Sequence, residues 1–335
     1  MELTVQLSDA RYDITVERGA LARAGERFAL GRRALIVTDD GVPAVYAGAV
    51  AAQCGAAHVV TLPQGERSKS FASLEDVLTA MLGQDLTRAD CVVAVGGGMA
   101  GDLAGLAAAL YMRGVDFYNV PTTLLAQVDS SIGGKTAVDL AGVKNIVGAF
   151  RQPRAVLIDP DTLRTLPRRQ LAAGLAEAIK MAAAGDADLF ARLEACTDLD
   201  AALPEIIVRA LAIKKAVVEA DPLETGVRRV LNFGHTLGHA IESAAGGALL
   251  HGECVAIGML PMCAPDVRTR LTAVLRKYGL PTRTDLTAGA LSPFLTHDKK
   301  ARAGGICTVF VPAIGAYEFR DRTPAEILRD WEEVG

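Results

Sequence analysis

The stretch Cys91-Val-Val-Ala-Val-Gly-Gly-Gly-Met-Ala-Gly-Asp102 decides the fold, because an apolar run leads directly into three consecutive glycines. We expect a buried strand over residues 91–95 and a helix over residues 102–111. Glycines at such a turn let the backbone approach a ligand, and the helix N-terminus favours an anion such as a pyrophosphate. The spacing is not a strict Gly-x-Gly-x-x-Gly, so a tight turn without a ligand is the alternative interpretation.

Strands and helices alternate around this turn. Strands are expected at residues 3–7, 12–16, 34–38, 57–62 and 117–120, with helices ending near residue 54 and covering residues 71–84. This alternation predicts a parallel, Rossmann-like sheet. The first two strands suggest a hairpin.

Helical periodicity dominates after a last short strand at residues 156–158. Helices are expected at residues 168–184, 187–196, 204–220, 235–245, 252–262 and 267–277, followed by a hairpin of residues 308–312 and 316–319. The predicted fold class is an α/β N-terminal Rossmann-like nucleotide-binding domain (residues 1–152) plus a mainly α-helical C-terminal domain (residues 153–335).

Composition narrows the class of protein. The chain has 335 residues, of which 50% are hydrophobic and 22% charged, as in globular proteins. A net charge of −4 argues against a nucleic-acid binder. The most apolar stretch, residues 92–112, is interrupted by glycines and Asp102, and the start lacks a signal-peptide pattern, so we expect no membrane span and a cytoplasmic enzyme. Six irregularly spaced cysteines favour buried free thiols.

Three of the five histidines fall within one short window. His235 and His239 lie in Asn232-Phe-Gly-His-Thr-Leu-Gly-His-Ala-Ile-Glu242, and His251 follows. Imidazole is the commonest metal ligand, and Glu177 in Gly174-Leu-Ala-Glu-Ala-Ile-Lys180 is the best-placed carboxylate to complete a set of three. Whether both His235 and His239 bind or one carries protons stays open. For Glu177 and Lys180, one helical turn apart, a surface ion pair is the alternative.

Further polar segments suggest sites for anions. The segment Pro121-Thr-Thr-Leu-Leu-Ala-Gln-Val-Asp-Ser-Ser-Ile-Gly-Gly-Lys-Thr136 is expected to be a polar loop, and Lys135, Lys144 and Arg113 would place three cations near one sheet edge for a phosphate or carboxylate. A solvated loop is the alternative. Residues 64–69 lie on a β–α loop within reach of a nucleotide. Residues 297–300 add cations or form a charged turn.

Taken in order, these segments resemble the 3-dehydroquinate synthase family of the sugar-phosphate cyclase group. The matching pieces are residues 64–69, 96–102, 121–136, 144–145, 174–180, 232–242, 251–258 and 298–300. The resemblance implies an active site in the cleft between the two domains, bound NAD, one divalent metal (zinc or cobalt) and a homodimer. It also implies a small-molecule sugar phosphate as substrate.

The resemblance also implies roles for individual residues. The metal ligands would be Glu177, His235 and His251, with His239 in the active site but not on the metal. The cofactor would contact Asp39, Gln64, Gly65, Glu66, Lys69, Gly97, Gly98, Met99, Ala100, Gly101, Asp102, Thr122, Thr123, Asp129, Thr162 and Thr165. The substrate would contact Arg113, Lys135, Lys144, Asn145, Lys180, Arg228, Asn232 and one of Lys299 or Lys300.

The implied reaction converts 3-deoxy-D-arabino-heptulosonate 7-phosphate to 3-dehydroquinate and phosphate, a step of the shikimate pathway towards aromatic amino acids. It is a lyase reaction without net redox change. Three departures from the family stand out: Asp139 replaces a common asparagine, Gln170 replaces a common glutamate, and the segment after Met262 is short.

Three alternatives to this function remain. A sister sugar-phosphate cyclase would share the fold, NAD and metal. A metal-dependent polyol dehydrogenase would lack the phosphate-binding cations and release NADH. A non-catalytic nucleotide-binding protein would have lost a metal ligand or Lys135, and neither is missing.

Overall fold

The computed structural model describes residues 1–296 and 305–334 and divides into two compact units, Met1–Leu166 and Pro167–Gly335. This division comes later than the one expected after residue 152. The difference arises from strand β9 (Ala155–Ile158), which pairs in parallel with strands β2 and β6 of the first unit. Residues 153–166 therefore complete the first sheet rather than begin the second unit.

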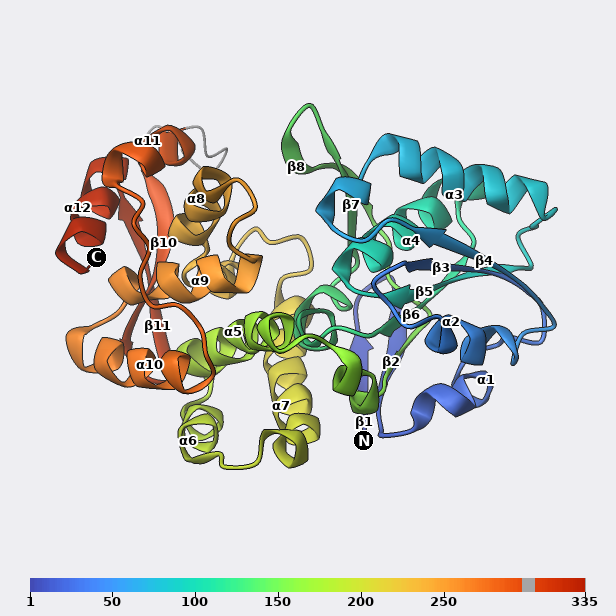
Figure 1. Cartoon of the computed structure of the whole chain (residues 1–335), viewed down its shortest axis with the longest axis horizontal. Helices are drawn as coiled ribbons and strands as arrows, with labels where there is room; N and C mark the ends of the chain where they lie inside the picture. Colours follow the sequence, from blue (N-terminus) through green and yellow to red (C-terminus); the bar gives the residue numbers. More distant parts are fainter. Residues whose placement is uncertain (297–304, 335) are drawn as a thin grey trace. The chain divides into compact units, whose positions relative to one another are not determined.

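A seven-stranded sheet with the order β1-β2-β9-β6-β5-β3-β4 forms the centre of the first unit (Figure 1). β1 and β2 pair antiparallel, as the expected hairpin, and the other neighbours pair in parallel. The predicted Rossmann-like sheet is confirmed. Besides β9, its strands are β1 (Glu2–Gln6), β2 (Arg11–Val16), β3 (Arg33–Asp39), β4 (Ala56–Leu62), β5 (Cys91–Gly96) and β6 (Asp116–Pro121).

Helices cover both faces of this sheet. Val92 and Ala94 of β5 pack with α3 (Phe71–Gly83) and α4 (Gly98–Leu110). Cys91, Val93 and Val95 face the other side, where α1 (Ala24–Arg27), the 3-10 helix η1 (Ala20–Arg23) and α2 (Ala44–Ala51) lie. A strand buried on both faces must be apolar at every position, which explains the uninterrupted run before the glycines. The helix after it begins at Gly98, four residues earlier than expected.

The segment expected as one polar loop is largely ordered and buried. It contains the π-helix η4 (Ala126–Ser130) and leads into an antiparallel hairpin of β7 (Lys135–Leu140) and β8 (Val143–Phe150). Gln127 and Val128 are fully buried, and the Gln127 side chain donates hydrogen bonds to Pro121 O and Asp159 O. The polar Gln127 side chain forms its hydrogen bonds inside the unit, so the polar character of this segment did not predict exposure to solvent.

In its described residues, the second unit is mainly helical, as predicted, with one antiparallel hairpin (Figure 1). Its helices are α5 (Arg168–Gly185), α6 (Ala187–Ala195), α7 (Leu199–Ala220), α8 (His235–Ala245), α9 (His251–Met259), α10 (Pro265–Lys277), α11 (Ala288–Thr296) and α12 (Pro324–Val334). The hairpin consists of β10 (Ile306–Ala313) and β11 (Ala316–Arg322). Shorter 3-10 segments are η5 (Pro160–Thr165) in the first unit, and η6 (Val227–Asn232) and η7 (Leu260–Met262) in the second.

Helices α11 and α12 were not expected from the sequence. For α12 a signal was present, since Thr323 and Glu326 form a reciprocal cap: Thr323 N donates to Glu326 Oε2 at 2.7 Å and Glu326 N donates to Thr323 Oγ1 at 3.3 Å. Ile327 and Trp331, one turn apart, are its buried residues. This is the capping-box pattern followed by an apolar stripe.

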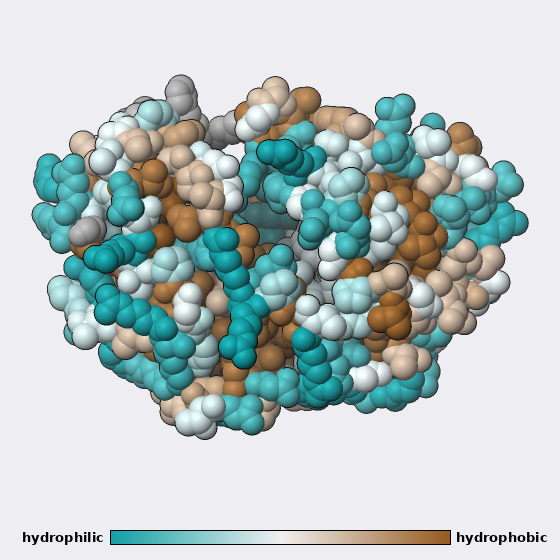
Figure 2. All heavy atoms as spheres, in the orientation of Figure 1, coloured by the Kyte–Doolittle hydropathy of each residue, from teal (hydrophilic) through white to brown (hydrophobic). Residues whose placement is uncertain are grey.

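Within residues 1–296 and 305–334, no helix combines the length and apolar character needed to cross a membrane. Figure 2 shows hydrophilic side chains distributed over the visible face of each unit. All six cysteines are free, and four of them are buried.

Candidate metal centre and cofactor edge

Three helices of the second unit meet through glycines. A Cβ on Gly252 of α9 would lie 1.9 Å from Ala173 O of α5, and one on Gly258 would lie 2.3 Å from Gly234 O, just before α8. A Cβ on Gly238 of α8 would lie 3.2 Å from Val255 Cα. The backbones of α5, α8 and α9 are therefore in direct contact, which no larger residue would allow.

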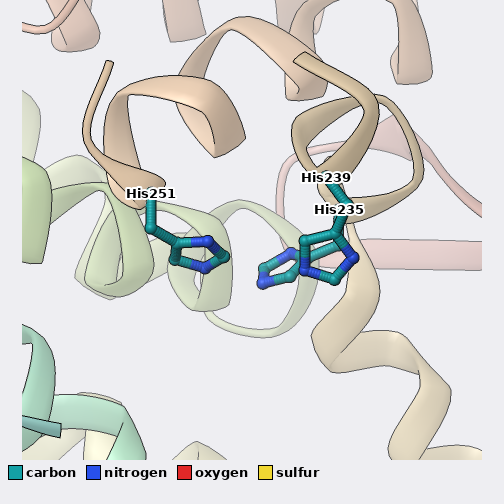
Figure 3. A group of neighbouring side chains, drawn as sticks. All are labelled: His235, His239 and His251. Atoms are coloured by element: carbon teal, nitrogen blue, oxygen red, sulfur yellow. The ribbon is translucent and has the colours of Figure 1, made fainter. Parts of the chain in front are cut away.

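This contact gathers the predicted metal-binding side chains. Figure 3 shows the rings of His235, His239 and His251 directed into one space, and their ligand nitrogens lie within 4.8 Å of one another. Glu177 of α5 joins them: its Oε1 lies 3.7 Å from His235 Nε2 and 3.6 Å from His251 Nε2. Two ligands of one tetrahedral zinc stand roughly 3.4 Å apart. The spacing of Glu177, His235 and His251 suits a single ion.

The other nitrogen of each of these two imidazoles is held by the protein. His235 Nδ1 lies 3.2 Å from Phe233 O, and His251 Nδ1 lies 3.0 Å from Glu242 Oε2. Such contacts orient a ring so that its second nitrogen faces the metal. Glu242 received no role from the sequence, although it lies seven residues after His235 on α8. That spacing placed it on the same helix face, and this was the available signal.

The Glu177 carboxylate is fully buried and lacks hydrogen bonds of ordinary geometry. Lys180 Nζ forms an ion pair with its Oε2 at 2.5 Å, and both side chains are buried, so the surface ion pair considered above is excluded. Burial alone would raise the pKa of Glu177, but the charges of Lys180 and the neighbouring histidines hold it well below its usual value. An ionised carboxylate with Oε1 facing two imidazole nitrogens fits a cation.

The histidines differ in their protonation. Burial, and then the charge of Lys180, lower the pKa of His235 well below its ordinary value, so its ring is neutral. Burial opposes the charged form of His251 as well, but the contacts with Glu177 and Glu242 raise its pKa to about 10. Metal binding requires the neutral ring, and carboxylates that favour a proton here also favour a metal cation in its place.

The start of α9 is fixed to α5 by an ion pair. Arg169 donates to both carboxylate oxygens of Glu253 at 2.7 Å, and Glu253 also accepts from Leu250 N at 2.8 Å. This bidentate pair holds His251, the first residue of α9, in a fixed relation to the helix that carries Glu177.

The residues expected to hold substrate in this unit are partly engaged with the protein. Asn232 Nδ2 donates to Glu224 Oε1 at 2.9 Å. Arg228 is buried, and its backbone N–H donates to Asp221 Oδ2 at 3.0 Å. Lys214, which the sequence analysis missed, is a further buried cation on α7, a helix that packs against α5 and η6. His297, Lys299 and Lys300 lie outside the described residues.

In the first unit, the expected cofactor residues gather at one sheet edge. The chain leaves β3 towards β4 and leaves β5 in the opposite direction towards β6, although β3 and β5 are neighbours. Ligands of such sheets bind outside the carboxyl ends of the strands at this switch point. Asp39 ends β3, and a cavity of about 660 Å³ lined by residues 38–44 lies beside it. Burial raises the pKa of Asp39.

The glycine turn supplies the other side of the switch point. Helix α4 begins at Gly98 without a side-chain cap, so backbone N–H groups remain for an anion at the N-terminus that contains Met99, Ala100, Gly101 and Asp102. Cβ atoms on Gly97 and Gly98 would lie 3.1 Å from Thr123 and 3.0 Å from Ser130. These glycines thus permit close packing inside the unit, a role the sequence analysis did not assign.

Other expected cofactor residues lie at the same carboxyl edge. Gln64 N donates to Asp40 Oδ1 at 2.7 Å, Thr122 follows β6, and Asp129 lies in η4. The Thr162 hydroxyl donates to Asp159 O at 2.7 Å, and the Thr165 hydroxyl lies 2.9 Å from Tyr46 Oη. Both threonine hydroxyls are engaged within the protein, and their contact with a cofactor stays a prediction.

The three expected cations lie on three different elements of the first unit. Arg113 lies after the C-terminus of α4, and Lys135 opens β7 beside Gly134, whose carbonyl accepts from Arg151 N at 2.7 Å. Lys144 lies near the opposite end of the hairpin. Residues 121–145 do not form one loop, since β7 runs extended between Lys135 and the turn, and the joint binding of an anion by these three cations stays a prediction.

Comparisons with known proteins agree with this architecture. Two family models match: "3-dehydroquinate synthase N-terminal" over residues 59–173 and "3-dehydroquinate synthase C-terminal" over residues 174–301. The chain is 44% identical to the 3-dehydroquinate synthase of Enterococcus faecalis, covering 94% of each chain. It is also 44% identical to that of Geobacter metallireducens, covering 99% of this chain and 97% of the relative.

Solved structures give the same fold. The 2-epi-5-epi-valiolone synthase of Streptomyces hygroscopicus, with NAD+ and Zn2+ bound, matches with a TM-score of 0.90 and 31% identity over 98% of both chains. A 2-deoxy-scyllo-inosose synthase complexed with carbaglucose-6-phosphate, NAD+ and Co2+ matches with a TM-score of 0.91 at 24% identity over 100% of both chains. A probable glycerol dehydrogenase of Sinorhizobium meliloti reaches a TM-score of 0.62 at 19% identity over 96% and 95% of the two chains.

Proposed function

The chain belongs to the 3-dehydroquinate synthase family, and from this premise we propose that it converts 3-deoxy-D-arabino-heptulosonate 7-phosphate to 3-dehydroquinate and phosphate. Its relatives at 44% identity carry that name, whereas the sister cyclase above is 31% identical. The second enzyme alternative, a polyol dehydrogenase, resembles the chain in fold alone at 19% identity. The proposed reaction is that of a carbon–oxygen lyase.

The observation that carries the proposal is the buried Glu177 carboxylate, whose Oε1 faces Nε2 of His235 and His251 at 3.7 and 3.6 Å. We assign the metal to these three residues. A divalent metal bound there would polarise the carbinol that is oxidised and the ketone that replaces it. His239 lies in the same cluster and is more exposed, which suits a residue that exchanges protons with the substrate rather than a ligand.

Lys180 balances the charge of the centre and adds a cation for the substrate. Its ammonium lies 2.5 Å from Glu177 Oε2, so it stabilises the ionised ligand before any metal arrives. Arg228 and Asn232, on η6 in the same unit, are donors of the kind that phosphate and carboxylate groups accept.

We place the dinucleotide at the switch point of the first unit. Asp39 at the end of β3 would accept from a ribose hydroxyl, and the uncapped start of α4 would bind the pyrophosphate. Bound NAD supplies a hydride acceptor that returns the hydride later in the cycle, so no NADH accumulates. Arg113, Lys135, Lys144 and Asn145 are assigned to the anionic groups of the substrate.

The test is phosphate release from the heptulosonate phosphate by the purified protein with catalytic NAD, after chelation and again after zinc is restored. We expect metal-dependent phosphate release, 3-dehydroquinate as product and no net absorbance at the nicotinamide band. Accumulating NADH would identify a dehydrogenase. Turnover of a different sugar phosphate, with none of this one, would identify a sister cyclase.

The assembly and location of the enzyme follow from the resemblance alone. We propose a cytoplasmic homodimer. Light scattering of the eluting protein would give its mass, for which twice 35.1 kDa is expected.

A further inference from the structure

The β7–β8 hairpin contains an irregularity near its turn. Val138 pairs with Val147 and Leu140 pairs with Val143, so the single residue Asp139 on β7 faces three residues on β8, namely Lys144, Asn145 and Ile146. The two-residue turn itself is regular, with Ala141 and Gly142 at φ values of 51° and 79°. Two additional residues are thus accommodated in a bulge, and such bulges redirect side chains next to functional sites.

Two hydrogen bonds of Asp139 hold this bulge in place. Asp139 Oδ1 accepts a hydrogen bond from Asn145 N at 2.8 Å, and Asp139 N donates to Lys69 O at 2.8 Å. Asn145 has a φ of 53°, a left-handed conformation that asparagine tolerates better than most residues. The Asp139 carboxylate therefore satisfies the backbone N–H of a residue whose conformation removes it from the strand ladder.

Lys69 fixes the side chain that the bulge presents. Its ammonium is buried, donates to Asn145 Oδ1 and lies 2.5 Å from Oδ2 of Asp102, the fifth residue of α4. A lysine ammonium has no acceptor, so the Asn145 amide must turn its oxygen to Lys69, and its donor Nδ2 then points away from it. An anionic substrate group needs a donor at this place.

The bulge therefore connects two predicted sites within the first unit. Lys69 and Asp102 belong to the expected cofactor edge, and Lys144 and Asn145 to the expected substrate contacts. We propose that Asp139 is a positioning residue, which holds the three-residue bulge against Lys69 and so sets where Lys144 and Asn145 meet the anionic substrate. This inference rests on the proposed function.

The experiment compares Asp139→Ala and Asp139→Asn with the wild-type holoenzyme. Alanine removes the acceptor for Asn145 N, so we expect KM for the heptulosonate phosphate to rise about tenfold, as for the loss of one charge-assisted hydrogen bond, with a smaller change in kcat. The affinity for NAD should stay within about twofold. Asparagine keeps Oδ1 as an acceptor, so it should restore KM to within about threefold of wild type.

Hydrogen exchange provides a second readout that needs no substrate. In Asp139→Ala the amides of residues 143–147 should exchange faster, while those of the central sheet should not. Asp9→Ala, at an exposed aspartate between β1 and β2 of the same unit, is the matched control and should change neither exchange in the β7–β8 hairpin nor KM.

Two results would overturn the inference. If the wild-type enzyme is active and Asp139→Ala leaves KM unchanged, Asp139 does not position the substrate contacts, and the proposed function stands. Equal losses in substrate and NAD affinity would also overturn it, since they indicate general disruption of the unit. An inactive wild-type enzyme would instead overturn the proposed function, and this inference with it.

Discussion

The two units use glycine for the same purpose but build their candidate sites from different groups. In the second unit, glycines bring α5, α8 and α9 into backbone contact, and the groups that converge are side chains. In the first unit, glycines let α4 pack closely against β6, β7 and η4, and the groups offered are backbone N–H donors and a strand-end carboxylate. A site of side chains is destroyed by truncating them, whereas a backbone site is destroyed by adding atoms.

The largest effect should follow from truncation in the second unit. We expect His251→Ala to weaken metal binding by more than about 100-fold, since a direct ligand is lost. Because His251 opens a helix and its side chain is 32% exposed, the free energy of unfolding of the metal-free protein should change by no more than about 1 kcal/mol. Metal content after dialysis and a urea titration measure both quantities.

His58→Ala is the matched control, at an exposed histidine on β4 of the first unit, and should retain full metal content. A His251→Ala protein that keeps its metal and turnover would remove His251 from the ligand set and leave His239 as the third ligand beside Glu177 and His235.

An intermediate effect should follow from adding one methyl group in the first unit. A Cβ on Gly96 would lie 2.7 Å from Ala100 Cβ, so Gly96→Ala must displace the start of α4. We expect NAD to bind about tenfold more weakly while zinc content stays unchanged. Titration calorimetry with NAD and metal analysis provide the two measurements.

Gly83→Ala is the control for the added methyl group, because a Cβ there meets no atom within 4 Å. Unchanged NAD affinity in Gly96→Ala would show that the α4 N-terminus is not a cofactor contact. A simultaneous loss of zinc would show that the two sites are not built independently.

The smallest effect concerns pH. Asp221 in the second unit also uses backbone donors: although burial opposes it, hydrogen bonds from Thr225 N, Gly226 N and Arg228 N lower its pKa to about 2. The unfolded value is about 3.9, so this stabilisation is complete above that pH and is lost as pH falls towards 2. We expect the ionised Asp221 to contribute on the order of 1 kcal/mol to the free energy of unfolding.

Urea unfolding midpoints measured between pH 5 and pH 2 test this prediction. The midpoint should fall with pH in the wild type, and part of this fall should be absent in Asp221→Asn. Asp285→Asn, at an exposed aspartate of the same unit, should follow the wild-type curve. A parallel decline in Asp221→Asn would assign the acid sensitivity to other carboxylates.

The clustering of the three histidines could be predicted from the sequence because it depends on residues that are close together in the chain. His235 and His239 are one helical turn apart, and His251 begins the next helix, so spacing alone placed three rings together. Glu177 came from another helix and was found by the resemblance and by its neighbour Lys180. Lys214 was missed because it lies in an apolar run beside Lys215, and only packing shows that one of the two is buried while the other pairs with Glu219.

The β7–β8 hairpin shows where local information ends. Its strands follow a segment rich in serine, threonine and glycine, which is typical of loops, yet η4 is helical and the Gln127 side chain donates hydrogen bonds inside the unit. The bulge at Asp139 depends on Lys69, which is far away in the sequence. The unit boundary was misplaced for a similar reason, since only the pairing of β9 with β2 and β6 assigns residues 155–158 to the first sheet.

The contacts between α5, α8 and α9 also have an entropic consequence. Gly252, Gly258 and Gly238 allow backbones rather than flexible side chains to set the separation of the helices. The conformational freedom of these helices is therefore lost during folding, and an incoming ion has only a few side-chain torsions left to order. The unfolded chain offers the proposed ligands Glu177, His235 and His251 without this arrangement, so a metal held by them would bind the native state preferentially and stabilise it by mass action. These three glycines thereby couple the metal affinity of the centre to the stability of the unit that contains it.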